Sequence, residues 1–271
     1  MEVAHKFLPT AGVVGLLPMV TYFFMVVAIF SFLGCFLFTL ATLSSVHPKR
    51  RTVHTLTAII SAIATITYYL IQTDYRNLLT ELSTVSDTTD RQTLIRESYN
   101  AIGQYRYMDW FVTAPLLLLQ IIFALNLRLE EIKRPLATLL IMASFLFFVS
   151  YIGHQQLSFD NEIQVSPKVG WGLLATLAYG FILLTLYRLW NQFSEQKNPE
   201  SQRAYRLTAL ITAGGWGVYL LGYFLTVTDV DFNWIHLAFT ITDLVTKIGV
   251  GIVVYFVSSS ALNNVRSERS E

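Results

Sequence analysis

Seven separate stretches of this 271-residue chain are apolar over lengths that cross a membrane as a helix. They fall at about 17–45, 52–73, 105–127, 135–153, 169–191, 206–227 and 234–261. Hydrophobic residues make up 54% of the sequence and charged residues only 14%, a balance that a soluble domain of this size does not need. The chain is therefore predicted to be an all-α membrane protein, a bundle of seven transmembrane helices that forms a single domain over 1–271.

An odd number of spans places the two ends of the chain on opposite sides of the membrane. With the N-terminal side outside, twelve Lys and Arg residues fall in the inner segments and five in the outer ones, Lys168 among the latter. The positive-inside rule then puts the C-terminal side in the cytoplasm. On this topology the polar stretch 74–104 is an extracellular loop, either a capping hairpin or a mobile segment, and 262–271 is a cytoplasmic tail.

The seventh stretch carries two ionisable residues near its centre. Lys247 lies within the apolar run TITDLVTKIGVGIVVYFV, and Asp243 precedes it by about one helical turn on the same face. A charged side chain at that depth costs roughly 3 kcal/mol or more, and ionisable residues inside membranes mark function by default. We therefore expect Lys247 to be chemically modified, with Asp243 balancing its charge.

The third stretch contains four polar side chains that share one helical face. In YRYMDWFVTAPLLLLQ (105–120), Arg106, Asp109 and Thr113 are three and four residues apart, and Gln120 lies eleven residues beyond Asp109, which is nearly three turns. From outside to inside this face presents a guanidinium, a carboxylate, a hydroxyl and a carboxamide. Such a polar stripe is predicted to face the interior of the bundle rather than lipid.

The charged residues of these two helices balance one another. Lys247 and Arg106 carry two positive charges, and Asp109 and Asp243 carry two negative ones. A neutral cluster is what a low-dielectric interior requires. A purely structural network of ion pairs is the alternative interpretation, although packing alone does not require a lysine in the middle of a helix.

With these residues in place, the chain resembles the microbial rhodopsins over essentially all seven helices. The resemblance rests on RYMDWFVTAPLLLLQ in the third helix, WGVYLLGY (216–223) in the sixth and DLVTKIGVG (243–251) in the seventh. It implies that Lys247 forms a Schiff base with all-trans retinal and that Asp109 and Asp243 are its counterions. It further implies a counterion network of Arg106, Thr113, Tyr68 and Tyr219, and a retinal pocket that includes Trp110, Leu117, Trp216 and Tyr223.

In that family the residue types at the positions of Asp109, Thr113 and Gln120 distinguish functions. Asp109 matches a proton acceptor, whereas Thr113 stands where sodium pumps carry a second carboxylate. Gln120 stands where outward proton pumps carry a proton donor, and a carboxamide cannot donate a proton at neutral pH. The resemblance thus implies a light-driven outward proton pump with slow reprotonation. Two alternatives stay open: a photosensor that signals to a separate transducer, and an atypical relative of the sodium pumps.

The remaining observations exclude other classes of function. The net charge of +1 argues against a nucleic-acid partner, no two histidines have the spacing of metal ligands with a carboxylate, and no enzymatic activity is expected. His54, His154 and His236 lie near the ends of the predicted helices, where we expect interfacial or packed histidines rather than proton relays. The expected partners are the lipid bilayer, a transported ion (H+ in the first place) and further copies of the chain in a homo-oligomer.

Overall fold

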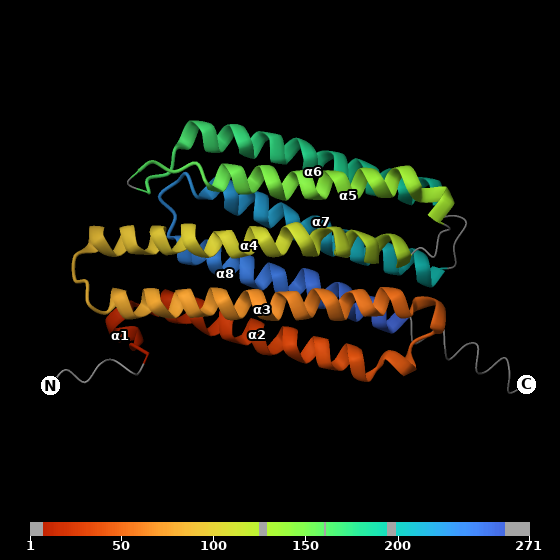
Figure 1. The fold of residues 1–271 in the computed structure, drawn as a ribbon, viewed down its shortest axis with the longest axis horizontal. Helices are drawn as coiled ribbons and strands as arrows, with labels where there is room; N and C mark the ends of the chain where they lie inside the picture. Colours follow the sequence, from red (N-terminus) through yellow and green to blue (C-terminus); the bar gives the residue numbers. More distant parts are fainter. Residues whose placement is uncertain (1–7, 125–128, 160, 194–198, 258–271) are drawn as a thin grey trace, which may run out of the picture.

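The computed structural model describes residues 8–124, 129–159, 161–193 and 199–257, and within these ranges seven helices are long and apolar enough to cross a membrane. Figure 1 shows them side by side in one elongated bundle. No sheet occurs in the described ranges, so the predicted all-α, seven-helix membrane fold is confirmed. The spans are α2 (Leu16–Ala41), α3 (Arg51–Leu82), α4 (Thr88–Ala124), α5 (Leu129–His154), α6 (Val165–Phe193), α7 (Pro199–Leu225) and a seventh helix over Phe232–Val257.

The seventh helix is not a regular α-helix throughout. It begins as α8 (Phe232–Asp243), continues as a π-helical turn, η4 (Leu244–Ile248), and returns to α-helix up to Val257. The N-cap residue Asp231 accepts a hydrogen bond from the backbone N–H of Asn233 at 2.8 Å, which fixes the start of the helix. A π-helical turn inserts one extra residue into the helical repeat and is frequent at functional sites. Here it includes Lys247.

The prediction of a loop over 74–104 is wrong. Helix α3 continues to Leu82 and α4 begins at Thr88, so only residues 83–87 connect them. The side chain of Asp87 accepts hydrogen bonds from the backbone N–H groups of Thr89 and Asp90 at the start of α4. The stretch is polar on average, yet its apolar residues recur at helical spacing and pack together in the buried cluster Leu78, Leu79, Leu82 and Ile102. The side of the membrane on which it lies stays a prediction, and 262–271 lies outside the described residues.

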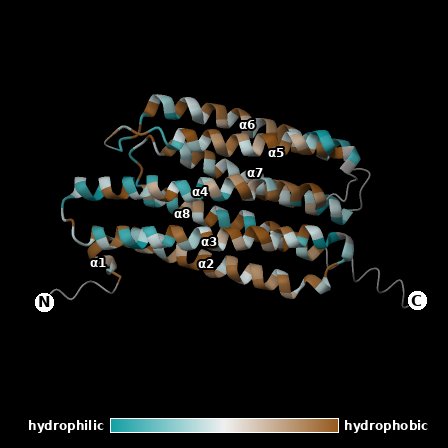
Figure 2. Ribbon diagram, in the orientation of Figure 1, coloured by the Kyte–Doolittle hydropathy of each residue, from teal (hydrophilic) through white to brown (hydrophobic). Residues whose placement is uncertain are grey.

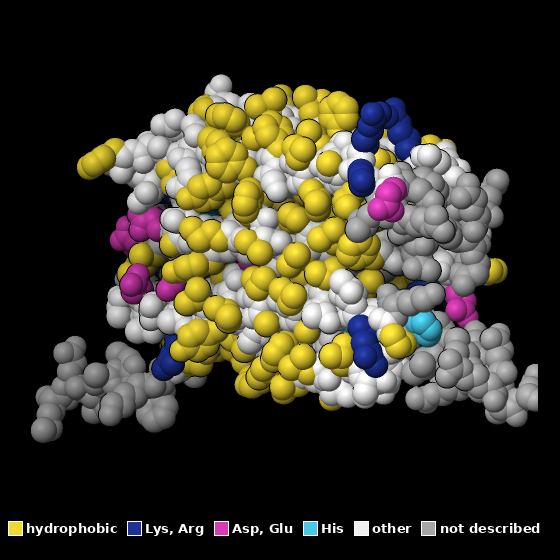
Figure 3. Space-filling model, turned by 45° about the vertical axis from the view of Figure 1, so that its right-hand side comes forward, with side chains coloured by type: hydrophobic (Ala, Val, Ile, Leu, Met, Phe, Trp, Pro, Cys, Tyr) yellow, Lys and Arg dark blue, Asp and Glu magenta, His cyan; other side chains and the backbone are white. Residues whose placement is uncertain are grey.

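The surface of the bundle is apolar around its middle. Figure 3 shows a broad band of hydrophobic side chains with Lys, Arg, Asp and Glu gathered toward the two ends, and Figure 2 shows the same gradient along the helices. Large apolar side chains that would be costly to expose to water point outward from several of the spans, among them Phe23, Phe30, Ile66, Phe148, Leu177 and Phe256. The protein is a multi-pass integral membrane protein that contacts the lipid bilayer.

We call the two ends of the bundle by their predicted sides. The outer end holds the connections 83–87, 155–164 and 226–231, and the inner end holds the connection 42–50. One outer residue departs from expectation: Lys168, which was counted as a loop charge, lies in the first turn of α6 and is only 1% exposed. The helix therefore begins earlier than its apolar stretch and carries the lysine into the bundle.

Candidate functional site

The side chain of Lys247 reaches the centre of the bundle, where it meets both predicted counterions. Its Nζ is in direct contact with Oδ2 of Asp109 and lies 3.5 Å from Oδ1 of Asp243. All three residues are at most 4% exposed. The structure thus brings together the three residues on which the sequence analysis depends. In this structure the free amine of Lys247 stands for the nitrogen of the predicted imine.

Asp243 is surrounded by hydrogen-bond donors from three other helices. Its Oδ1 accepts from the Tyr219 hydroxyl at 2.6 Å and from the indole N–H of Trp110 at 3.0 Å, and its Oδ2 accepts from the Tyr68 hydroxyl at 2.7 Å. Several donors on one carboxylate favour its charged form. These contacts hold Asp243 at the junction of α3, α4, α7 and the seventh helix.

Asp109 has far fewer partners than Asp243. Its Oδ2 contacts Lys247 and lies 3.5 Å from the Thr113 hydroxyl, which donates more closely to the backbone carbonyl of Asp109 at 2.9 Å. Its Oδ1 has no hydrogen-bond partner within the described chain. This carboxylate therefore combines direct contact with the lysine nitrogen and an oxygen that is free to take a proton. Those are the two geometric requirements for a proton acceptor.

Arg106 closes the charge cluster on its outer side. One of its guanidinium nitrogens, Nη1, donates to the Tyr68 hydroxyl at 3.0 Å and lies 3.5 Å from Oδ2 of Asp243. The other, Nη2, donates to the Thr240 hydroxyl at 3.0 Å. Arg106 is 2% exposed, so its charge must be balanced inside the protein. With Lys247, the two arginine and lysine charges match the two carboxylates, as the sequence predicts.

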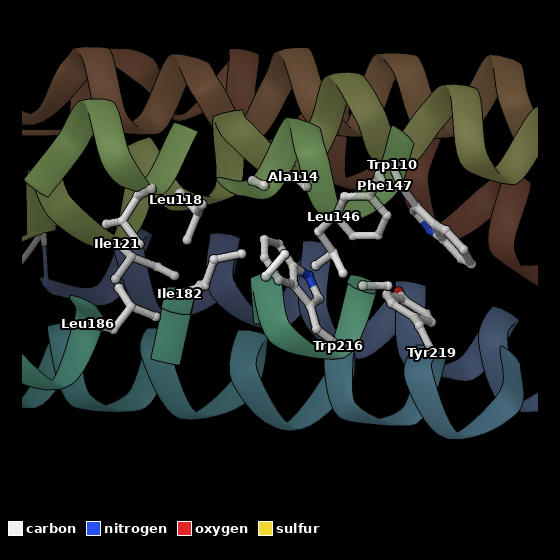
Figure 4. Close-up of a cluster of buried hydrophobic side chains, with 14 of the residues drawn as sticks. Trp110, Ala114, Leu118, Ile121, Leu146, Phe147, Ile182, Leu186, Trp216 and Tyr219 are labelled. Carbon is white, nitrogen blue, oxygen red and sulfur yellow. The ribbon is translucent and has the colours of Figure 1, made fainter. Parts of the chain in front are cut away.

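A cavity walled by aromatic rings adjoins this cluster. Trp110 stacks on Tyr219 with ring centroids 4.3 Å apart, and the rings of Trp216 and Phe147 lie edge to face with centroids 5.3 Å apart. Figure 4 labels these four residues within the buried cluster. The lining side chains come from α4, α5, α6 and α7: Tyr107, Trp110, Leu146, Phe147, Ser150, Tyr179, Trp216, Tyr219, Leu220 and Tyr223.

The side chains that line this cavity suit a polyene by their chemistry. Flat aromatic walls suit a long conjugated chain, and the polar tips of the tyrosines find partners elsewhere. Tyr219 belongs both to the cavity wall and to the donors on Asp243, so the cavity begins next to the charge cluster. Three of the four residues predicted for the retinal pocket line this cavity: Trp110, Trp216 and Tyr223.

Leu117 and Gln120 lie outside the aromatic cavity. Leu117 is buried in a separate apolar cluster with Val53, Ile60, Val250 and Val254. Leu117 was predicted to line the retinal pocket, but it does not line this cavity, because its side chain points from α4 toward α3 and the seventh helix.

Gln120 is fully buried on the inner side of the site. Its Nε2 donates to the Thr57 hydroxyl at 2.7 Å and to the carbonyl of Val53 at 3.3 Å, so it links α4 to α3. Sequence reasoning missed Thr57, although a signal existed. Thr57 precedes Tyr68 by eleven residues, nearly three turns, and therefore lies on the same face of α3 as this predicted site residue.

The comparison with known proteins agrees with this geometry. The family model described as "Bacteriorhodopsin-like protein" matches residues 18–260. The chain belongs to this family, the type 1 rhodopsins. Members of the family are light-driven transporters and not enzymes, so the expectation of no enzymatic activity is confirmed.

Individual relatives are distant. The chain is 23% identical over 169 residues to the green-light absorbing proteorhodopsin of Gamma-proteobacterium EBAC31A08, a match that covers 59% of this chain and 63% of that protein, less than two thirds of its length. It is 25% identical over 230 residues to a bacteriorhodopsin-II-like protein of Haloquadratum walsbyi, covering 82% and 83% of the two chains.

Solved structures share the fold. The rhodopsin of Exiguobacterium sibiricum superposes with a TM-score of 0.75 at 22% identity, covering 91% of this chain and 98% of that one. Xanthorhodopsin, whose structure is described as that of a light-driven ion pump with dual chromophore, superposes with a TM-score of 0.73 at 19% identity, covering 94% and 97%. At these identities the likeness establishes the seven-helix architecture alone.

Proposed function

We propose that this type 1 rhodopsin carries all-trans retinal on Lys247 and exports protons in the light, with Asp109 as the proton acceptor. The observation that carries the proposal is the difference between the two carboxylates. Asp109 touches the lysine nitrogen and keeps one oxygen free, whereas Asp243 is held by three neutral donors. A pump needs one carboxylate that changes protonation and one that stays charged to balance the site.

The chain's own residues divide the work of proton transfer. Retinal held on Lys247 would supply a light-driven isomerisation that lowers the proton affinity of the Lys247 nitrogen. Asp109 Oδ2 then accepts the proton from that nitrogen across a direct contact. Asp243 and Arg106 stay as an ion pair at 3.5 Å, so the site remains neutral while the proton moves from the Lys247 nitrogen to Asp109. Protons leave toward the outer end, past Arg106.

The return of a proton to the Lys247 nitrogen is proposed to be slow. On the inner side of the site Gln120 occupies the line of approach, and a carboxamide binds water but does not donate a proton at neutral pH. Its Nε2 is already engaged by Thr57. The nitrogen must therefore wait for a proton that comes from the inner aqueous phase.

Two alternatives follow from the same residues. A photosensor benefits from a long-lived deprotonated state, and Gln120 favours such a state. A sodium pump needs a carboxylate where Thr113 stands, and Thr113 donates to the backbone of Asp109 instead. The transporter proposal also includes the predicted topology, with the C-terminal side of the chain in the cytoplasm, and assembly with further copies of the chain in the bilayer.

The proposal is tested in lipid vesicles that contain the retinal-loaded protein in known orientation. We expect light to move protons from the predicted inner side to the outer side, the pH change to vanish with a protonophore, and its size to be the same with and without sodium. A signal that requires sodium, and grows when the protonophore is added, would identify a sodium pump. A photocycle without any net transport would support the photosensor.

A further inference from the structure

A group of buried histidine, asparagine and lysine side chains lies between the charge cluster and the outer end of the bundle. His154 is the last residue of α5, Lys168 lies in the first turn of α6 and His236 lies in the first turns of α8. Asn100 of α4 lies beside them. Each is at most 6% exposed. The sequence placed the two histidines near helix ends, but burial excludes an interfacial role for either of them.

These side chains carry polar atoms without protein partners. Both ring nitrogens of His236, Nδ1 of His154, both amide atoms of Asn100 and Nζ of Lys168 have no hydrogen-bond partner within the described residues. A buried polar atom without a partner costs about 1–3 kcal/mol. Histidines that served only for packing would be expected to bond through at least one nitrogen. His236 does not, so its two nitrogens must be served by something other than protein.

The members of the group are connected through aromatic contacts. The ring of Tyr99 lies between the two imidazoles, with its centroid 5.2 Å from that of His236 and 5.7 Å from that of His154. His154 in turn bonds through Nε2 to the carbonyl of Asn100 at 2.9 Å. Gly103 makes room for this arrangement, because a Cβ at that position would collide with the His154 ring.

One end of the group touches the charge cluster. The backbone carbonyl of His236 lies 3.5 Å from Nη2 of Arg106, whose Nε has no protein partner in the described part of the chain. The other end reaches Lys168, whose ammonium lies 5.4 Å from the centre of the Tyr223 ring and interacts electrostatically with His154. The group therefore extends from Arg106 to the outer turns of α5 and α6.

The charges that face the imidazoles are positive. Arg106 acts on His236, and Lys168 acts on His154. The other titratable groups that face His236 are the tyrosines Tyr75 of α3 and Tyr99 of α4, and Lys168 packs against Tyr223 of α7. The nearby acid Glu162 is 62% exposed and pairs with Arg96 at 2.7 Å. An extra proton on either imidazole is thus repelled and passed on rather than stored.

We propose that His236, followed by His154, carries the exported proton from the Arg106 region to the outer surface, with ordered water linking the imidazoles. One nitrogen of the neutral His236 ring accepts a proton while the other N–H gives its proton to the next water, so one proton enters, one leaves and the ring stays neutral afterwards. His154, whose Nε2–H is held by the carbonyl of Asn100, takes up the proton and passes it on at Nδ1 alone. The proton that starts this transfer is the one lost when the O–H bond of protonated Asp109 breaks. The inference rests on the proposed outward proton transport and names its exit path.

The test uses the full-length, retinal-loaded protein and two signals from the same flash. Visible absorbance reports proton loss from the Lys247 nitrogen, and a pH-sensitive dye reports the proton at the surface. In His236→Gln we expect the first signal to keep its time course within about twofold and the second to be delayed by about 10-fold or more, since removal of a positioned proton-transfer group has effects of this size or larger. His154→Gln should give a smaller delay. His47→Gln, at the inner end, should give none.

Several outcomes would overturn the exit path. An unchanged dye signal in His236→Gln would remove the residue from it, and so would an equal slowing of both signals, which indicates a structural role. A proton signal in wild type that requires chloride would identify the group as an anion site instead. These failures leave light-driven transport in vesicles intact, whereas the absence of transport in wild-type vesicles would refute the proposed function itself.

A second measurement does not depend on the photocycle or on the survival of one variant. In retinal-free protein labelled with ¹⁵N-histidine, the ring N–H of His236 should exchange with water rapidly despite its burial, and slow exchange would refute a water-linked path. If His236→Gln fails to give coloured protein, Gly103→Ala provides the alternative, because it displaces the His154 ring and should delay the dye signal alone. A dye signal of normal timing in coloured Gly103→Ala protein would contradict the path.

Discussion

Replacing each of the two carboxylates by its amide should have opposite consequences. Asp243→Asn removes the negative charge that faces both Lys247 and Arg106, each at 3.5 Å. At an effective dielectric constant of about 20, each of these interactions amounts to roughly 5 kcal/mol before solvation is counted. The amide also presents an N–H₂ group where the carboxylate accepts from Tyr68, Tyr219 and Trp110.

The net cost for Asp243→Asn is smaller than the sum of these contacts but still large. Removing one partner of a buried ion pair typically costs about 3–5 kcal/mol. In a protein of this size each kcal/mol of lost stability lowers the melting temperature by about 2–4 °C. The coloured Asp243→Asn protein should therefore lose its visible band at a temperature about 10 °C lower than wild type. Its yield should fall for the same reason.

Asp109→Asn should destabilise the protein less than Asp243→Asn does, and it should abolish the chemistry. Lys247 keeps Asp243 at 3.5 Å, and Arg106 keeps all of its partners. The visible band should shift to the red, because a negative charge in contact with the lysine nitrogen is gone. Fast proton loss from that nitrogen after a flash should disappear, since an amide does not accept the proton.

The two variants are compared by absorption spectroscopy during heating and by flash photolysis at neutral pH. The reasoning requires Asp243→Asn to bleach at a clearly lower temperature than Asp109→Asn. It also requires fast proton loss to survive in coloured Asp243→Asn protein and to be lost in Asp109→Asn. Equal bleaching temperatures, or normal proton loss in Asp109→Asn, would refute the assignment of a permanent anion and a separate proton acceptor.

Three further predictions concern the attachment site, the inner half and the helix packing. Lys247→Ala should stay colourless after addition of all-trans retinal, whereas the exposed Lys133→Ala should form the visible band normally. Gln120→Glu should shorten the recovery time of the photocycle by about 10-fold or more, because a carboxyl group can donate the proton that an amide cannot. In wild type the proton comes from bulk water, so recovery should slow by about tenfold for each unit by which the pH rises. Fast, pH-independent recovery of wild type would contradict this. Gly222→Ala should destabilise the protein by about 1–3 kcal/mol, since its Cβ would collide with the Phe239 ring, whereas Gly214→Ala, which meets no neighbour within 4 Å, should be neutral or stabilising by up to about 1 kcal/mol in thermal bleaching.

Much of the site could be predicted from spacing alone because helical geometry is regular. Residues three, four and eleven apart share a helical face, so the common face of Arg106, Asp109 and Gln120 can be predicted from the sequence of one helix. The balance of charges then indicates that their partners lie on the seventh helix. The positions of the helices follow from the length of the apolar stretches. These inferences use local rules that membrane helices obey closely, since every backbone polar group in lipid must be satisfied within the helix.

The features that the sequence did not predict depend on contacts between helices. The extension of α3 and α4 beyond the membrane rests on an amphipathic face that average hydropathy conceals. The π-helical turn at Lys247 changes the helical repeat by one residue without any proline or glycine inside it. The burial of Lys168 and His236 depends on which helices lie next to α6 and α8, and the neighbours of a helix cannot be predicted from residue spacing within it.

The two halves of the bundle differ in the kind of polar group they bury, and this difference suits outward transport. Toward the outer end lie Arg106, His154, Lys168 and His236, groups that carry or pass charge. Toward the inner end the buried polar side chains of the described chain are hydroxyls and a carboxamide, apart from His54 in the first turn of α3, which bonds Thr42 at 3.1 Å. Hydroxyls and amides can hold water but do not store a proton near neutral pH. On the proposed mechanism, a proton that leaves Lys247 meets buried titratable groups mainly on the outer side of Asp109, so we expect departure to be faster than refilling and the slow step to lie at Gln120.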